Sequence, residues 1–308
     1  IQLQHDKTFG SGALNGTDAN GDSTGNDSEL DLNQAWVKLA VTDNSSLKLG
    51  RQELVRGNGS ILGRYDHLQT PQSGDGWVFD SSYDDIDYSI WSFRQNDAAA
   101  LAGIDTDIHG IDVDFQDIYG GDLHVHYYHA TGLGDPATAG NSLDTYGFDW
   151  SKDYEEWDFY VQYAAQSGDN GAAAPIDYDG TLWNLAVGYD LKEDHKLGLS
   201  WTSYSGDETD SATEDQAWVN LAGDGHKFLG YADVFAQSNI EDITFTWDRQ
   251  VNDKNSFHLA YHMFSLENVD GGVQVLGGAG AGLPGWTGYN ATNNGTAALD
   301  ANTVADDD

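Results

Sequence analysis

The sequence has 308 residues, no cysteine, and 51 acidic against 13 basic residues, which gives a formal net charge of -38. The absence of cysteine excludes disulfides, thiolate metal sites and cysteine nucleophiles, and the acidity argues against nucleic acid as a partner, because phosphate binding requires Lys and Arg. No run of about 18 apolar residues exists, so a membrane-spanning helix is excluded. A transmembrane β-barrel escapes this test, because only every second residue of its strands faces lipid.

An alternation of apolar and polar residues recurs along the chain and predicts thirteen β-strands. In the segment 155–166, for example, Trp157, Phe159 and Val161 alternate with Asp158 and Gln162. Most of the strands have about ten residues, the length that crosses a bilayer at a tilt, whereas soluble sandwiches more often use about five or six. The predicted strands are 1–9, 30–42, 45–54, 76–83, 86–95, 108–117, 121–130, 143–151, 155–166, 181–191, 195–204, 240–250 and 255–265.

The connections between these strands alternate strictly between short and long. The short ones lie at 43–45, 84–85, 119–121, 152–154, 192–194 and 252–254. The long ones, rich in Gly and Asp, lie at 10–29, 55–75, 96–107, 131–142, 167–180 and 205–239. Short periplasmic turns and long outer loops are typical of an outer-membrane barrel. We therefore predict an all-β fold, a transmembrane antiparallel β-barrel over 1–265, followed by a Gly/Asn/Asp-rich loop or tail at 266–308.

The odd number of strands requires an explanation, because single-chain bacterial barrels normally have an even number. The chain begins in mid-strand, and no closing strand with a terminal aromatic follows 255–265. We expect a parent barrel of about 14 to 18 strands. Either strands are missing at both ends, or a weakly patterned segment such as 273–276 supplies one.

In a barrel the polar half of each strand faces the lumen. The predicted pore-lining charged and imidazole side chains are Lys38, Lys48, Asp112, Asp114, His124, His126, Asp158, Lys196, Asp242, Asp248 and His258. Acids outnumber bases, so the pore is expected to favour cations unless a local basic constriction overrides them. The alternative is that these side chains only bridge neighbouring strands. His124 and His126 have a spacing that could bind a metal, but no third His or Cys completes a site in sequence, so we interpret them as lumen-facing.

One segment has the ligand spacing of a calcium loop. Positions 1, 3, 5, 7, 9 and 12 of an EF-hand-like loop are occupied by Asp18, Asn20, Asp22, Thr24, Asn26 and Glu29. Against this, position 6 is Ser23 where Gly is expected, strands flank the loop, and such spacing arises readily in an acid-rich chain. We expect no cofactor other than this candidate structural Ca²⁺. No catalytic motif is present, so we do not expect an enzyme.

Several short motifs lie between about 30 and 265, namely AWVKL at 35–39, LKLGRQEL at 47–54, ILGR at 61–64, Phe79-Asp80, Ser205-Gly206-Asp207 and GHKFLGYADVF at 225–235 followed by Asn239. In their order and spacing they resemble the alginate-export family of outer-membrane porins. The last resembles a loop motif of the family, which singles out His226, Lys227, Gly230, Asp233 and Asn239.

The resemblance implies a monomeric, eighteen-stranded barrel that passes an anionic polysaccharide through an Arg-rich constriction. By motif match, Arg51 and Arg64, with Lys48 nearby, are candidates for contacts at that constriction. The chain departs from the pattern in having only five arginines, at 51, 56, 64, 94 and 249. Arg51 also shares strand parity with the lipid-facing Leu47 and Leu49. A bulge could re-aim it, it could lie above the membrane, or the predicted phase of the strand could be wrong.

Two functions follow from this pattern. The first is an outer-membrane porin, surrounded by lipid and lipopolysaccharide, with a substrate-selective channel for small polar solutes, (oligo)saccharides or uronates. It predicts that loop 55–75 or 205–239 folds inward. The alternative is a structural or interaction barrel with a plugged lumen, whose acidic outer loops bind a partner, polysaccharide or divalent cations.

Overall fold

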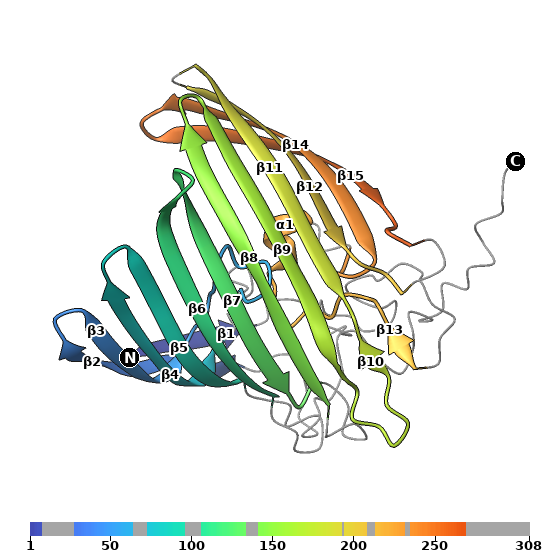
Figure 1. Ribbon diagram of the computed structural model, residues 1–308. Helices are drawn as coiled ribbons and strands as arrows, with labels where there is room; N and C mark the ends of the chain where they lie inside the picture. The colour runs from blue at the N-terminus through green and yellow to red at the C-terminus, as the bar shows by residue number, and fades with distance from the viewer. Residues whose placement is uncertain are drawn as a thin grey trace, which may run out of the picture.

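A curved antiparallel sheet dominates the computed structural model, which describes residues 1–7, 28–63, 73–95, 106–133, 141–192, 194–207, 213–231 and 235–268 (Figure 1). Apart from the short strands β10 (Asp177–Tyr178) and β13 (Glu214–Asp215), each strand pairs with the next in chain order. The order is β1 (Gln2–Lys7), β2 (Ser28–Thr42), β3 (Ser45–Gln52), β4 (Gly74–Tyr83), β5 (Ile86–Gln95), β6 (Thr106–Ile118), β7 (Gly121–Thr131), β8 (Ser142–Tyr154), β9 (Trp157–Asp169), β11 (Thr181–Lys192), β12 (His195–Tyr204), β14 (Ile240–Asn252) and β15 (Asn255–Ser265). All thirteen predicted strands are confirmed, with boundaries that differ by a few residues.

The sheet has a turn end, where short turns join neighbouring strands, and an opposite loop end, at which the strands joined by longer connections begin or end (Figure 1). The turns between β4 and β5 and between β8 and β9 contain Asp84 and Glu155 in the left-handed region, at φ 49° and 54°. The predicted turn at 152–154 is displaced to 155–156, because cross-strand pairing of β8 with β9 continues as far as Tyr154 and Trp157.

The two faces of the sheet differ as the alternation predicts. Large apolar side chains remain exposed on the convex face, among them Trp77, Ile111, Phe148, Phe245 and Leu259. The opposite face carries buried polar side chains, including Asp112, His126, Gln162 and Asp242. This reversal of the arrangement in soluble proteins is expected of a barrel wall, in which the apolar band faces lipid and the interior is polar.

Among the described residues the sheet is open, with β1 and β15 at its two edges. The described helix α1 (Gly225–Phe228) has one turn, and none of the described helices has the length and apolar character to cross a membrane. Beyond the end of β9, the unpredicted strand β10 pairs with β9 and, in parallel, with β13. Burial raises the pKa of Tyr178 in this small ribbon to about 12, with Asp215 and Asp169 adding to the shift.

Candidate functional site

Two segments fold from the loop end into the concave side of the sheet. The first, which we call the inner loop, comprises residues 53–63, and the second, the helix segment, comprises 213–231 and 235–239 and carries α1 (Figure 1). The sequence predicts that one of the connections 55–75 and 205–239 folds inward, and in their described parts both do. The site is therefore built from two connections and the wall between them.

The inner loop and the helix segment are joined mainly through their backbones. The amide of Gly63 donates to the carbonyl of Ala222 at 2.7 Å, and the amide of Asp224 donates to the carbonyl of Gly59 at 3.0 Å. Gly223 is required at this junction, because a Cβ there would lie 1.8 Å from the carbonyl oxygen of Ser60. The Asp224 side chain caps α1 by accepting from the Lys227 amide at 3.3 Å.

An apolar core fills the space between these two segments and the wall at the loop end. The inner loop contributes Ile61 and Leu62, and the helix segment contributes Trp218, Val219, Leu221, Ala222 and Leu229. The wall contributes Trp91, Phe93, Ile108, Tyr128, Ala130, Leu143, Ala164, Leu182, Tyr204 and Ile240. The interior is therefore apolar and close-packed at this end, which the expectation of a uniformly polar lumen did not include.

Hydrogen bonds from polar side chains of the wall hold both segments. Gln166 accepts from the Val219 amide at 2.8 Å and donates to its carbonyl at 2.7 Å. Gln162 donates to the Ser60 hydroxyl at 2.8 Å, and Asn58 donates to the Tyr160 hydroxyl at 2.6 Å. Buried and partly buried polar groups are costly to leave without partners, so these contacts fix the two segments in place.

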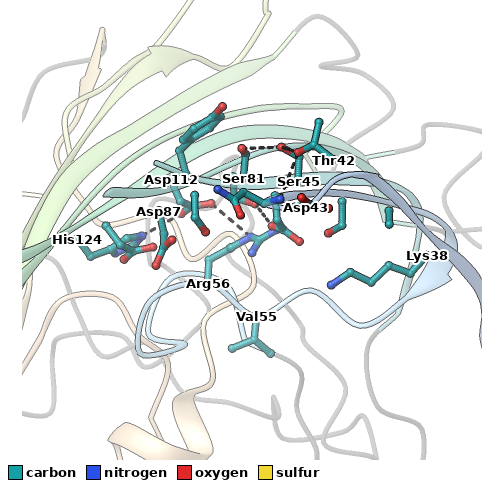
Figure 2. A pocket seen from close by; sticks show the side chains of 18 of the residues that line it. Lys38, Thr42, Asp43, Ser45, Val55, Arg56, Ser81, Asp87, Asp112 and His124 are labelled. Atoms are coloured by element: carbon teal, nitrogen blue, oxygen red, sulfur yellow. Dashed lines mark hydrogen bonds and ion pairs between the residues drawn. The ribbon is translucent and has the colours of Figure 1, made fainter. Parts of the chain in front are cut away.

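Asp112 on β6 is the polar centre of the contact between the inner loop and the wall. Its carboxylate accepts from Trp91 Nε1 at 2.6 Å and from the Tyr128 hydroxyl at 2.7 Å. It lies 3.3 Å from Arg56 Nε and 3.0 Å from His124 Nε2. Figure 2 shows Arg56 reaching from the inner loop toward Asp112, with His124 beside them. With only 3% of Asp112 exposed, an unpaired charge at this position would be strongly unfavourable.

Three donors of metal-binding type meet beside Asp112. His124 Nδ1 lies 2.7 Å from Asp149 Oδ2. His126 is buried, and neither of its ring nitrogens makes a hydrogen bond within the described part of the chain. One donor atom of each of the three residues lies within 4.8 Å of the others. The sequence predicts that His124 and His126 share the luminal face, which Asp149 on β8 also occupies, but it does not show that Asp149 completes a group with them.

A polar cavity of about 780 Å³ lies between the inner loop and the wall and extends toward the turn end (Figure 2). Carboxylates line it from several strands and a turn, namely Asp43, Asp80, Asp87, Asp112 and Asp114. Lys38 and Arg56 are the cations among its described lining residues. The negative excess on this wall agrees with the acidic lumen that the sequence predicts.

Several predicted pore-lining residues pair with side chains of other strands. Lys196 on β12 lies 2.8 Å from Asp158 on β9, two strands away across β11, and His258 lies 2.6 Å from Asp248 on the neighbouring strand β14. Asp242 accepts from His262 at 2.7 Å. These contacts fit the alternative in which luminal side chains bridge strands.

Lys48 takes a different position, with its ammonium group 4.4 Å from the ring centroid of Trp36. Both residues, like Lys38, lie on the luminal face by register. Trp36 is 46% exposed and was not among the predicted pore-lining residues.

Arg51 does not lie at the constriction, which corrects the prediction from the motif match. It is in register with Asp75 on the outer face, next to Leu49 and Trp77, and its guanidinium donates to Asp75 at 3.2 Å. The ordinary alternation of β3 puts it there, so the strand phase was right. A second ion pair, in which Arg94 lies 2.8 Å from Asp107, continues the row of charged side chains from Arg51 and Asp75 across the outer face at the loop end.

Replacement of Arg51 by alanine is therefore expected to leave single-channel conductance unchanged. The lost ion pair is partly exposed, and such pairs contribute no more than about 1 kcal/mol. Conductance in planar bilayers and the heat-induced mobility shift of the folded barrel on gels measure both effects. A changed conductance in a normally folded variant would indicate that Arg51 lies in the lumen after all.

The residues of the family-like loop occupy the helix segment and its junction with the wall. His226 and Lys227 lie on α1, and Lys227 Nζ donates to the carbonyl of Asn58 at 2.8 Å. Gly230 has a φ of 89°. Asn239 donates its backbone amide to the carbonyl of Ser205. The structure does not describe Arg64, Asp233, residues 18–27 of the candidate calcium loop, or the tail beyond 268.

Comparison with protein families gives a decisive match. A family model described as alginate export matches residues 1–302. The chain belongs to the alginate export family. It is an outer-membrane β-barrel of a Gram-negative bacterium. No individually curated protein matches it.

Solved structures of Occ and Opd proteins resemble this alginate export family member in fold. Acinetobacter baumannii OccAB2 is 13% identical, with 83% of this chain and 65% of that chain covered and a TM-score of 0.53. Pseudomonas aeruginosa OpdK, solved with vanillate, is 13% identical, with coverages of 80% and 67% and a TM-score of 0.50. Pseudomonas aeruginosa OccK2 (OpdF), in complex with glucuronate, is 17% identical, with coverages of 73% and 60% and a TM-score of 0.48. The chain thus spans about three fifths of the length of OccK2.

Proposed function

We propose that this chain forms the wall and the constriction of a monomeric, water-filled, substrate-selective channel for small polar solutes, saccharides or uronates. The observation that carries the proposal is the position of the inner loop. It is fixed against the wall through Asp112 and Gln162, and a polar cavity of about 780 Å³ remains beside it. A loop held inside a barrel narrows the passage without filling it, which is the requirement for selection by size and charge.

The charge of the cavity supports a preference for cations. Asp87 and Asp114 are in register on β5 and β6, and both line the cavity with Asp80 and Asp112. Fixed charges of one sign in a narrow, low-dielectric passage concentrate ions of the opposite sign. Uronates would then depend on Lys38 and Arg56, which lie in the same cavity.

Trp36 supports saccharides as part of the solute class. Its partly exposed ring on the luminal face is an apolar surface beside the ammonium group of Lys48. Sugars present apolar faces as well as hydroxyls, so such a ring can hold one while the ammonium contacts its oxygens. The alginate export family to which the chain belongs agrees with this class.

In planar bilayers with a salt gradient, we expect a reversal potential of the sign that marks cation preference. The double variant Asp87→Asn and Asp114→Asn is expected to move that potential toward zero, because two carboxylates leave the cavity. The matched control is Asp75→Asn, which removes a carboxylate from the outer face. Neutral oligosaccharides and uronates added to one side then identify the solute by the current that they block. Anion preference in the unmodified protein would contradict the proposed selectivity.

The plugged interaction barrel is the second candidate, and the apolar core favours it. Close packing of Leu62 and Trp218 against the wall closes part of the interior at the loop end. No conductance from a correctly folded, full-length protein would support this alternative and would refute the channel.

A further inference from the structure

The group His124, His126 and Asp149 offers two nitrogens and one oxygen on the wall of the lumen, and the channel proposed above has no use for it as a ligand set. His124 and His126 lie two residues apart on β7 and therefore on one face of the sheet. Asp149 on β8 lies directly opposite His124 in the register of the two strands. Within the part of the chain that the structure describes, these are the residues whose donor atoms gather closely enough for a metal ion.

His126 is the observation that points to a ligand. Only 3% of the residue is exposed, and neither ring nitrogen has a hydrogen-bond partner among the described residues. The ring packs between the rings of His124 and Tyr128, with centroid distances of 5.4 Å and 4.9 Å. Buried polar groups in folded proteins almost always have a partner. An imidazole held in this way is suited to donate its lone pair to a metal ion.

His124 already has the surroundings of a metal ligand. Its Nε2 lies 3.0 Å from Asp112, while its Nδ1 points at Asp149 at 2.7 Å. Histidines that bind metals usually donate their second ring N–H to a carboxylate, which fixes the tautomer and the ring orientation. Asp112 performs that role for Nε2, and Nδ1 is left to coordinate the ion beside Asp149.

We propose that His124, His126 and Asp149 bind a divalent transition-metal ion, with Zn²⁺ as the best fit to two imidazoles and one carboxylate. The ion takes the place of the proton between His124 and Asp149, which leaves to solvent, and water supplies the fourth ligand. Small side-chain movements are needed to reach the spacing of about 3.3 Å between ligand atoms that tetrahedral zinc requires. The donor atoms of His124 and Asp149 separate from 2.7 Å, and His126, within 4.8 Å of both, moves closer.

Local charge and access both fit this proposal. Asp112, Asp114 and Asp149 surround the two histidines, whereas Arg56 is the nearby cation from the inner loop. The carboxylates therefore exceed the guanidinium in number and attract a further cation. His124 lines the 780 Å³ cavity, through which a hydrated ion can arrive.

The test is metal binding by the full-length, tag-free protein, folded in detergent and stripped of metal with a chelator. Equilibrium dialysis followed by elemental analysis is expected to give one Zn²⁺ per chain, and Co²⁺ in its place is expected to give the visible absorption of a tetrahedral site. His126→Gln is expected to weaken Zn²⁺ binding by at least about tenfold, the loss typical of a removed ligand or its support. Asp149→Asn serves as the second variant if His126→Gln does not fold.

The matched control is His258→Gln, which removes another luminal histidine that is paired with a carboxylate but lies outside the group. It is expected to bind Zn²⁺ as the unmodified protein does. The proposal is overturned if Zn²⁺ does not bind, if the variants of the group bind it as tightly as the control, or if millimolar Ca²⁺ displaces it. The experiment involves no ion flow, so its outcome is separate from that of the channel measurements.

Discussion

Replacement of Asp112 by alanine is expected to release the inner loop from the wall and to enlarge the conductance of the channel. The carboxylate holds Arg56, His124, Tyr128 and Trp91 at distances of 3.3 Å or less. Its loss leaves the Arg56 charge, on a side chain that is 17% exposed, without its partner, and breaking a fully buried ion pair from one side costs about 3–5 kcal/mol, which is the upper bound here. The wall is held by the hydrogen-bond ladders of β5 to β8 and is expected to stay folded. The substitution therefore weakens mainly the attachment of the inner loop to the wall.

Trypsin measures this release directly, because Arg56 is itself a cleavage site. In the native protein the loop is held on both sides, by Asn58 against Tyr160 and by Lys227 against the Asn58 carbonyl. We expect slow cleavage there, and fast cleavage together with larger, noisier single-channel currents in the Asp112 variant. Asp87→Ala is the control, since it removes the same charge from the same cavity without a described contact to Arg56. Equal cleavage rates in the two variants would contradict the role of Asp112.

The wall of the barrel was predictable because its signal is local. A strand between lipid and water alternates residue by residue, so segments such as Trp157 to Gln162 give both the strand and its faces. The same alternation places Arg51 on the outer face with Leu49, which is where the structure has it. The family motif suggested the constriction instead, because a motif match carries no information on the direction of one side chain.

The interior was harder to predict, because parity does not say what covers a luminal residue. Trp91 and Tyr128 share the face of Asp112, and nothing in their own strands shows that connections far away in sequence bury them. The contact of Ser60 with Gln162 joins residues 102 positions apart. The sequence offered one usable signal of a contact between the inner loop and the acidic wall, since Arg56 is one of only five arginines in an acidic chain.

Replacement of Gly223 by alanine is the steric counterpart of the Asp112 variant, and it is expected to separate the inner loop from the helix segment. The added methyl would lie 1.8 Å from the Ser60 carbonyl oxygen and 2.8 Å from its carbon. Backbone atoms cannot rotate away as a side chain can. Overpacking typically costs about 1–3 kcal/mol, and the hydrogen bonds between Gly63 and Ala222 and between Asp224 and Gly59 are strained as well. We expect faster tryptic cleavage after both Arg56 and Lys227, because each segment loses the other as its support.

Gly198→Ala is the matched control, because its methyl would meet mainly the hydroxyl of Thr246, a side chain that can change rotamer. It lies on β12, away from both segments. Comparison with the Asp112 variant then separates two supports of the loop. If the wall alone holds the loop, Gly223→Ala leaves cleavage after Arg56 slow and accelerates only cleavage after Lys227. If the two segments act as one unit, as their shared apolar core requires, either substitution releases both, and combining them adds less than the sum of their separate effects.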